Sequence, residues 1–583
     1  MESDTEVPYT QFACIGTGFS GIGLGATLRR WYDITDIKLF ERGADLGGTW
    51  TVNQYPGAAC DVPSALYSFS FATNPTWTRI LPSAAELRAY LQRVADDYDL
   101  PSKMVFNTAV ERCEWIEERA RWRLTVRDLV SGETSLHECQ FLFSGAGQFS
   151  TPRELDVPGL QNFKGEVMHS ARWRPEVDLR NKNVVVFGNG CTAAQIVPSI
   201  LPLTKHVTQI VRSKHWIMPP VDRVISKRMA WWLEHTPGML WLQRFIIFWL
   251  AEADFPAYVS ANSGYRKARQ SIAERYMRKA APKKYHDLLI PEFDYGTKRR
   301  VFDSGYLKAL HADNMTLTNE PAVEILENGV RLRNGDVVAA DVLVLANGFQ
   351  LNELQGDIKV SGRNGKTIED HWDEFGGAEA YNCTSLSGFP NFFFLLGPNT
   401  VTGHTSTVMA IENAINYALR VIRPVLEGRL TIVDVKREAE EAYVAKVHRA
   451  LEEMVWANGG SKNWYTKELE VGGVKRTWNG MTYPWWQGHY WYHCLFPVWR
   501  DWQYGGKPCK PTIAKRRAAS RWLLTFVFLA LGGVAASRWA RSNPDSRLAA
   551  AAMRLAMLCI PGNKLSGNDL ASRVRSGRFL WKS

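Results

Sequence analysis

The chain has 583 residues, which exceeds one ordinary domain and predicts about three or four domains. Apolar residues make up 45% and charged residues 22%, a globular composition that excludes a largely disordered chain. The net charge of +11 equals the excess carried by residues 515–583, where thirteen Lys or Arg stand against two Asp. The body is therefore neutral, and we expect no nucleic-acid partner.

Nine cysteines are scattered along the chain without a single CxxC pair. This pattern favours neither a disulfide framework nor a thiol redox centre, and it fits a reducing compartment. The first residues, MESDTEVPYTQF, contain acids and lack the apolar core of a secretory signal. We therefore predict a cytoplasmic protein that is not secreted.

The first motif, GTGFSG, follows a short apolar strand pattern and precedes a helical pattern. In a dinucleotide-binding fold, Gly16 permits the tight turn, Gly18 lets the backbone approach a pyrophosphate, and Gly21 lets the helix pack on the strand. Glu41 lies 20 residues after Gly21, at the end of the next strand pattern, where its carboxylate can accept hydrogen bonds from ribose hydroxyls. These features predict a first nucleotide site.

A loop with neither helical nor strand period follows, GGTWTVNQYPGAACD at residues 47–61. Its backbone polar groups need partners, so such a loop is either solvated or wrapped around something polar.

A second motif appears at NVVVFGNGCTAA, where Gly188, Gly190 and Ala193 take the three close-approach positions. The strand pattern that follows ends in Arg212 rather than in an acid, which suits a 2′-phosphate better than a bare ribose. Two nucleotide modules with opposite charge preferences predict two different nucleotides. We predict FAD at the first and NADPH at the second, placed so that hydride passes from nicotinamide to flavin.

Two further buried strand patterns, in residues 141–152 and 341–352, bracket the second module and are interpreted as crossings between domains. We predict an α/β fold with two Rossmann-like domains, the FAD domain discontinuous and the NADPH domain inserted. A helical, Trp-rich insertion either shapes the substrate entrance or contacts a membrane. The predicted parts are residues 1–150 and 350–510 for the FAD domain, 151–349 for the NADPH domain with the insertion at 222–290, and 511–583 for a basic and apolar tail.

Within the tail, residues 522–537 form a run of sixteen uncharged, mostly apolar residues with basic residues on both sides. A membrane-spanning helix needs about 20 apolar residues, so this run is short. Two interpretations stay open: a single C-terminal segment that contacts or tethers the protein to a membrane, and a helix packed on the body.

Between the two modules stands FKGEVMHSARWR, with the spacing F-x-G-x-x-x-H-x-x-x-W, and the loop at 47–61 fits G-G-x-W-x-x-x-x-Y-P-G-x-x-x-D. Over about residues 8–505 the chain resembles the class B flavoprotein monooxygenases, specifically the Baeyer-Villiger monooxygenase family of the fungal secondary-metabolism type. One departure is Arg174, where the family usually has Pro or Asp, and N-oxygenating relatives differ at this position too. The fingerprint residues are Phe163, Gly165, His169 and Trp173.

The resemblance implies that Arg299, in the segment GTKRR, lies over the flavin and stabilises the anionic oxygen species that attacks a carbonyl. It also implies that Asp61 orients this arginine and that His169 has a structural rather than a proton-transfer role. Without the resemblance, a basic run such as residues 298–300 is usually a solvated face. The predicted cofactor-binding residues are Gly16, Gly18, Gly21, Glu41, Gly48, Thr49, Trp50, Asp61, Val62, Tyr67, Gly188, Asn189, Gly190, Thr192, Ala193, Arg212 and Ser213, and no metal site is predicted.

The predicted function is an FAD- and NADPH-dependent monooxygenase that uses O2 to oxidise a ketone to an ester or lactone. The expected partner is a small-molecule substrate, a bulky and lipophilic ketone from secondary metabolism. Alternatives are an N- or S-oxygenase on the same scaffold, and an uncoupled NADPH oxidase or electron-transfer flavoprotein. The sequence leaves the oligomeric state open.

Overall fold

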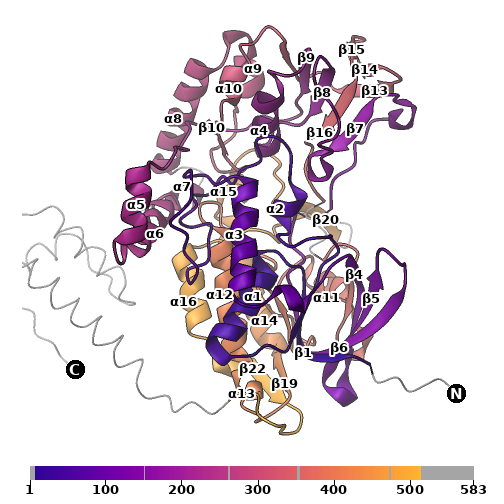
Figure 1. Ribbon diagram of the computed structural model, residues 1–583, viewed down its shortest axis with the longest axis vertical. Coiled ribbons are helices and arrows are strands. Elements are labelled where there is room, and N and C mark those ends of the chain that lie inside the picture. The colour runs from indigo at the N-terminus through magenta and orange to yellow at the C-terminus, as the bar shows by residue number, and fades with distance from the viewer. Residues whose placement is uncertain (1–6, 150, 260–262, 351–354, 472–473, 514–583) are drawn as a thin grey trace, which may run out of the picture. The chain divides into compact units, whose positions relative to one another are not determined.

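The computed structural model describes residues 7–149, 151–259, 263–350, 355–471 and 474–513 (Figure 1). These residues belong to one compact unit that ends at Ile513. The apolar run at 522–537, with the rest of the tail from residue 514, lies outside the described residues. Within the described ranges, no helix combines the length and apolar character needed to cross a bilayer.

An eight-stranded mixed sheet lies in the lower part of Figure 1. Its strand β1 lies between β2 and β6 and runs parallel to both, while β4, β5 and β6 form an antiparallel meander. In the order of the sheet, the strands are β17 (Lys359–Ser361), β4 (Thr108–Ile116), β5 (Arg121–Asp128), β6 (Thr134–Ser144), β1 (Tyr9–Ile15), β2 (Ile37–Phe40) and β3 (Met104–Val105), and β18 (Phe392–Phe394) pairs with β6.

A five-stranded, wholly parallel sheet lies in the upper part of Figure 1. Its central strands, with sequences NVVVF and VLVL, are almost continuously apolar because both faces of a parallel sheet are covered. In the order of the sheet, the strands are β12 (Met315–Thr318), β9 (His206–Ile210), β8 (Asn183–Phe187), β16 (Val342–Leu345) and β7 (Glu166–His169).

Four small sheets complete the strand pattern. They pair β10 (Ile217–Met218) with β11 (Val301–Phe302), β13 (Ala322–Leu326) with β14 (Gly329–Leu332) and β15 (Val337–Ala339), β19 (Ile432–Val435) with β22 (Trp502–Gly505), and β20 (Lys467–Val471) with β21 (Val474–Trp478).

Helices surround both sheets, and α1 packs against α3 and α12. Helix α12 begins directly after Ser406, whose side chain accepts a hydrogen bond from the backbone N–H of Val408 at 3.2 Å. Such a cap stabilises a helix by about 1 kcal/mol. The helices are α1 (Phe19–Tyr32), α2 (Thr49–Val52), α3 (Ala84–Asp97), α4 (Cys191–Ile200), α5 (Lys227–His235), α6 (Met239–Glu252), α7 (Pro256–Val259), α8 (Gly264–Ala280), α9 (His286–Leu289), α10 (Tyr306–Ala309), α11 (Ile368–Phe375), α12 (Thr407–Val421), α13 (Arg423–Leu426), α14 (Arg437–Glu452), α15 (Val455–Asn458) and α16 (Gln487–Leu495).

The strands of the five-stranded sheet all come from residues 166–345, between the two parts of the chain that build the eight-stranded sheet. The segments after β6 and after β16 meet at a bridge between Pro152 and Phe349. The structure confirms the predicted α/β class. The predicted insertion at 222–290 contains α5 to α9, while the domain boundaries at 150, 349 and 510 stay predictions.

Candidate active site

A cavity of about 2020 Å³ is lined by the loops that follow strands of both sheets. These loops begin at the carboxyl ends of β1, β2 and β6 in one sheet and of β8, β9 and β16 in the other. Ligands of open α/β sheets bind at this end of the strands. The cavity is therefore placed to hold groups delivered by two nucleotide folds at once.

The first glycine motif forms a tight turn at the cavity wall. Gly16 has a φ of +98°, and a Cβ there would lie 2.6 Å from the carbonyl oxygen of Gly145. A Cβ on Gly21 would lie 2.1 Å from the carbonyl oxygen of Gly16, so α1 packs directly on the turn. Gly18 lines the cavity just before the N-terminus of α1, which favours an anion there.

Glu41 also lines the cavity, and its carboxylate braces the turn of the first motif. It accepts hydrogen bonds from the backbone N–H and hydroxyl of Thr17, both at 3.0 Å, and from the backbone N–H of Gly43 at 2.8 Å. A carboxylate has about four acceptor sites, so capacity remains for a ribose hydroxyl.

The irregular loop at 47–61 is held between the two folds rather than solvated. The hydroxyl of Tyr55 donates to the side-chain oxygen of Gln195 at 2.9 Å, and the amide of Gln195 donates to the carbonyl of Ala59 at 3.0 Å. Gln195 lies on α4, directly after the second glycine motif. A Cβ on Gly57 would lie 2.3 Å from the hydroxyl of Ser199 on the same helix. Sequence reasoning missed Gln195, because an isolated amide on a helix carries no motif.

Arg299 and Asp61 form a bidentate ion pair on the cavity wall. The Nε of Arg299 donates to Oδ2 of Asp61 at 2.7 Å, and its Nη2 donates to Oδ1 at 2.6 Å. The side chains are 27% and 23% exposed, and both line the cavity. Arg300 instead donates to Asp254 at 2.7 Å and to the hydroxyl of Tyr258 at 2.8 Å. The basic run is thus not one solvated face, because its two arginines have separate acidic partners, Asp61 and Asp254.

Both partners are held in their charged forms. Burial alone would raise the pKa of Asp61, but Arg299, assisted by Arg300, outweighs this effect and lowers the pKa below its ordinary value. Burial alone would lower the pKa of Arg299, but the Asp61 carboxylate raises it well above its ordinary value. Arg299 therefore presents a permanent positive charge to the cavity.

The second glycine motif and the end of β9 form a basic part of the cavity. Arg212 is exposed, lines the cavity and forms no ion pair with any residue that the structure describes. Lys298 lines the same cavity, and burial together with the charge of Arg212 lowers the pKa of Lys298. The amide of Asn189 donates to the carbonyl of Ser213 at 3.2 Å, which fixes the chain beside Arg212. Two cations side by side suit a phosphate.

His169, at the end of β7, joins the five-stranded sheet to the loop after β16. Its Nδ1 accepts a hydrogen bond from the backbone N–H of Ala171 at 3.0 Å, so the proton lies on Nε2, which donates to the carbonyl of Gly348 at 3.0 Å. Burial lowers the pKa of His169, which keeps the ring neutral. Gly348 lines the cavity, whereas His169 does not, and this geometry supports the predicted structural role.

The remaining predicted residues divide into two groups. Those that line the cavity are Gly48, Thr49, Trp50, Val62, Tyr67, Gly188, Gly190 and Thr192. Those that do not are Gly21, Ala193, Phe163, Gly165 and Trp173, which lie at packing positions or in close backbone contacts. Arg174, the departure from the family pattern, forms an ion pair with Glu166.

Several cavity-lining polar atoms fit a polar ligand and were missed by sequence reasoning. Gln148 Nε2, His215 Nδ1 and Asn347 Oδ1 are buried without a hydrogen-bond partner, and all three residues line the cavity. Buried polar atoms normally have partners, so these atoms favour a bound group that supplies them. At Gly190 the space where a side chain would lie is open. The residues present therefore fit cofactors with polar ring edges and phosphates.

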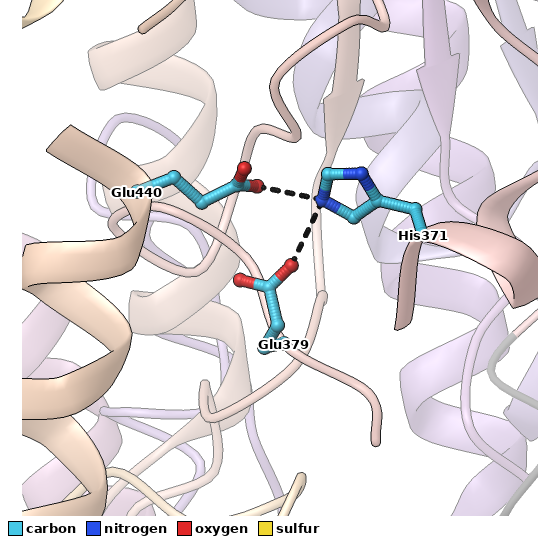
Figure 2. Close-up of side chains that lie close together, drawn as sticks. All are labelled: His371, Glu379 and Glu440. Carbon is cyan, nitrogen blue, oxygen red and sulfur yellow. Dashed lines mark hydrogen bonds and ion pairs between the residues drawn. The ribbon is translucent and has the colours of Figure 1, made fainter. Parts of the chain in front are cut away.

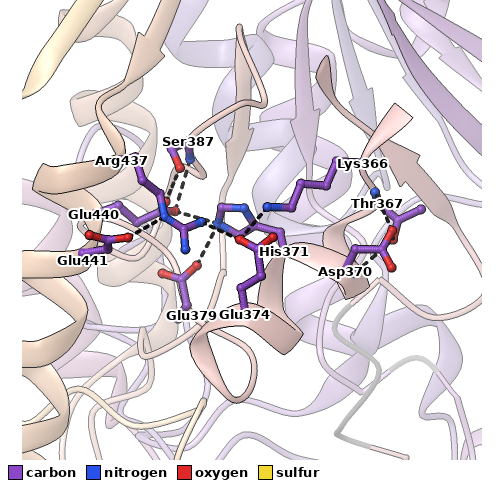
Figure 3. A network of polar contacts seen from close by, with 10 residues as sticks. All are labelled: Lys366, Thr367, Asp370, His371, Glu374, Glu379, Ser387, Arg437, Glu440 and Glu441. Carbon is purple, nitrogen blue, oxygen red and sulfur yellow. Dashed lines mark hydrogen bonds and ion pairs between the residues drawn. The ribbon is translucent and has the colours of Figure 1, made fainter. Parts of the chain in front are cut away.

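A second cluster of titratable residues lies outside the cavity lining (Figure 2). Nε2 of His371 lies 3.2 Å from Glu379 and 3.1 Å from Glu440. Glu440 also accepts hydrogen bonds from the backbone and hydroxyl of Ser387, and Arg437 and Lys366 lie in the surrounding network (Figure 3). No metal was predicted. Among the described residues, this is the one group whose metal-ligand atoms all lie within 4.8 Å of one another.

The cluster binds protons more tightly than its residues do in water. Burial alone would lower the pKa of His371, but its hydrogen bonds and the charges of Glu379 and Glu440 raise it to about 9. Burial raises the pKa of Glu379 to about 8 although His371 opposes the rise. In the unfolded chain, the ordinary pKa is 4.5 for Glu and 6.5 for His. The folded state therefore still holds protons at pH values where the unfolded chain has released them. Their contribution to stability is present below those unfolded values and is lost as the pH rises through about 8 and 9.

We expect Glu379→Gln to weaken this pH dependence, because glutamine does not titrate. Between pH 6 and pH 9 the wild type should lose on the order of 1 kcal/mol more unfolding free energy than the variant. Denaturant unfolding curves at both pH values measure this difference. Burial raises the pKa of Asp434 to about 7, so this residue also titrates between pH 6 and pH 9. It is present in the wild type and in the variant, so it does not contribute to the difference between them.

The matched control is Glu374→Gln. Glu374 bridges Lys366 at 2.6 Å and Arg437 at 3.1 Å, but its side chain is 49% exposed. This variant should keep the wild-type pH dependence. Equal pH dependence in wild type and Glu379→Gln would contradict the assignment, and a change of the wild-type curve on adding EDTA would indicate a bound metal instead.

The fold and the cavity together define an oxidoreductase with two dinucleotide sites. Residues 10–252 match the model of the FMO-like family, described as flavin-binding monooxygenase-like. The chain is 36% identical over 476 residues to a Baeyer-Villiger monooxygenase of Pseudomonas aeruginosa, covering 82% of this chain and 88% of the relative. It is also 36% identical over 479 residues to a Baeyer-Villiger monooxygenase of Streptomyces coelicolor, covering 81% of this chain and 89% of that relative. The chain belongs to the Baeyer-Villiger monooxygenase family of the class B flavoprotein monooxygenases.

Similar folds occur among solved structures. Cyclohexanone monooxygenase from Rhodococcus bound to NADP+ superimposes with a TM-score of 0.75 at 24% identity, covering 86% of this chain and 100% of that one. An oxidised steroid monooxygenase bound to NADP gives a TM-score of 0.72 at 24% identity, covering 85% of this chain and 99% of that one. At this identity the likeness shows the shared fold, and it confirms the predicted architecture of two Rossmann-like domains.

Proposed function

We propose that this protein uses FAD, NADPH and O2 to insert one oxygen atom beside a ketone carbonyl, which gives an ester or a lactone and water. The observation that carries the proposal is the bidentate pair of Arg299 and Asp61 on the wall of a cavity shared by both nucleotide folds. An enzyme that only transfers electrons has no need of a fixed guanidinium at this place.

The first glycine motif, Glu41 and the loop at 47–61 would hold FAD, and the second motif with Arg212 and Ser213 would hold NADPH. When bound, FAD accepts two electrons from NADPH and then activates O2. Thr49, Trp50, Val62 and Tyr67 line the same cavity as Asp61. The rings of Trp50 and Tyr67 meet edge to face, with centroids 5.5 Å apart.

The protein contributes charge and orientation. Arg299 keeps its positive charge throughout, so it stabilises the negative charge that develops on oxygen when a carbonyl is attacked. Asp61 holds the guanidinium plane in one orientation through two hydrogen bonds, so little side-chain reorganisation is needed during the reaction. His169 holds the cavity-lining loop at Gly348 against β7 and takes no part in proton transfer.

The proposed substrate is a bulky, lipophilic ketone of secondary metabolism. An FAD-binding monooxygenase of Aspergillus niger, 30% identical over 475 residues, supports a role of the fungal type; the match covers 80% of this chain and 77% of that relative. We also propose a cytoplasmic protein whose tail, through residues 522–537, contacts a membrane.

Product analysis with a panel of cyclic and polycyclic ketones tests the proposal. With NADPH and 18O2, we expect one labelled oxygen in an ester or lactone. Amines and sulfides are included because their exclusive oxidation would favour an N- or S-oxygenase. Peroxide formation with every carbonyl, without labelled product, would favour an uncoupled NADPH oxidase.

A further inference from the structure

Helix α6 exposes many of its large apolar side chains, although Ile247, Phe248 and Ala251 pack against the core. Its sequence is MLWLQRFIIFWLAE, and the one residue of its fourteen that is fully buried is Glu252. Trp241 and Leu250 are 68% and 67% exposed, and Leu242, Phe245, Ile246 and Trp249 are exposed as well. Large exposed apolar patches of this kind mark interaction sites.

Both charged side chains of α6 form hydrogen bonds with other parts of the protein. Arg244 donates to the carbonyls of Ala65 at 2.7 Å and Ser68 at 2.9 Å. Glu252 accepts from His404 at 3.0 Å and from the backbone N–H of Gln487 at 3.1 Å, at the start of α16. The outer face of α6 is consequently without charge. These contacts also hold α6 firmly in place, so the exposed face is not the result of a loosely packed helix.

Two neighbouring helices extend the apolar face. On α5, Met229, Trp231 and Trp232 are exposed, and on and after α16 so are Trp491, Tyr492, Phe496 and Trp499. Helix α16 starts against the end of α6, where the rings of Phe255 and Trp486 lie 5.6 Å apart. All three helices lie on the same side in Figure 1. We call this surface, formed by the exposed side chains of α5, α6 and α16, the aromatic face.

The charges beside the aromatic face are mainly basic. Arg223, Lys227 and Arg228 are exposed and form no ion pair with any residue in the described ranges, and Glu234 is the nearby exposed acid on α5. Tryptophan and tyrosine are enriched where a protein meets the headgroup region of a bilayer, and basic residues are attracted to anionic lipids. A second copy of the chain would bring the same cations together, which disfavours a dimer through this surface.

We propose that the aromatic face is a membrane-docking surface that inserts into the interfacial region of an anionic phospholipid bilayer without crossing it. The docking is a property of the described body, in addition to any contact made by the tail. It needs no spanning helix, because an apolar face need only enter the boundary between headgroups and acyl chains.

The test is flotation of the full-length protein with vesicles of phosphatidylcholine and phosphatidylglycerol. Wild type should float with the vesicles. The double variant Trp241→Glu/Leu250→Glu should lower the partition coefficient by about tenfold or more, because it removes two apolar side chains and places two carboxylates in the interface. Both positions are exposed, and circular dichroism checks that the variant is folded.

The matched control is Val130→Glu/Val337→Glu, which adds the same charge at positions that are 81% and 54% exposed outside the aromatic face. The control should bind vesicles as the wild type does. Equal binding by both double variants would overturn the proposal and assign docking to the tail. A concentration-dependent dimer in analytical ultracentrifugation, lost in Trp241→Glu/Leu250→Glu and without vesicle binding by the wild type, would overturn it in favour of a second copy.

Discussion

Replacing Arg299 with alanine should abolish ester formation while reduction of the flavin by NADPH continues. The variant removes the one permanent cation that Asp61 holds on the cavity wall, so negative charge on oxygen loses its stabilisation. Loss of a single well-placed donor costs about 10²- to 10³-fold in kcat, and loss of a full charge should reach at least the upper part of that range. Stopped-flow absorbance follows flavin reduction, and gas chromatography follows the product.

Arg299→Lys separates charge from geometry. Lysine keeps the positive charge but cannot make the two parallel hydrogen bonds to Asp61, so we expect partial activity with more NADPH consumed per product formed. Arg174→Ala is the matched control, because Arg174 is paired with Glu166 and does not line the cavity. Unchanged product yield in Arg299→Ala, with the protein folded and flavin bound, would refute the role of this residue.

Arg212→Ala should raise the KM for NADPH by about tenfold or more and leave the KM for NADH nearly unchanged. The basis is a charged hydrogen bond to the 2′-phosphate, which is worth about 1.5 to 3 kcal/mol. Arg212 lines the cavity without an ion pair in the described part of the chain, so its charge is available to a ligand. Steady-state kinetics with both nucleotides measures the effect.

Lys214→Ala is the control for this measurement. Lys214 lies two residues further on, pairs with Glu292 at 3.5 Å and does not line the cavity. Its removal should change the two KM values little and to the same extent. A parallel rise of both KM values in Arg212→Ala would count against a phosphate contact and would instead indicate a general effect on the nucleotide site.

Local sequence predicted the two glycine turns well because each is specified by neighbouring residues. Gly16 needs a positive φ and Gly21 needs the absence of a Cβ, and both requirements lie within one strand, turn and helix. The strand sequences NVVVF and VLVL predicted buried parallel strands for a similarly local reason. Gln195, by contrast, acts through loop residues about 140 positions earlier, and nothing around it in the sequence marks that contact.

By itself, the sequence determined the class of fold, the order of the two nucleotide modules and the charge preference of each, because short-range periodicity and glycine spacing depend on adjacent residues. The family resemblance implies that Asp61 orients Arg299, and the two side chains do meet in the structure. Only the tertiary structure decided that Arg300 has different partners and that the charges of α6 point inward. The physical reason is that contacts between residues far apart in the chain depend on how complete sheets and helices pack. The same apolar sequence in α6 could equally have formed a buried core helix, and only its place on the body leaves it exposed.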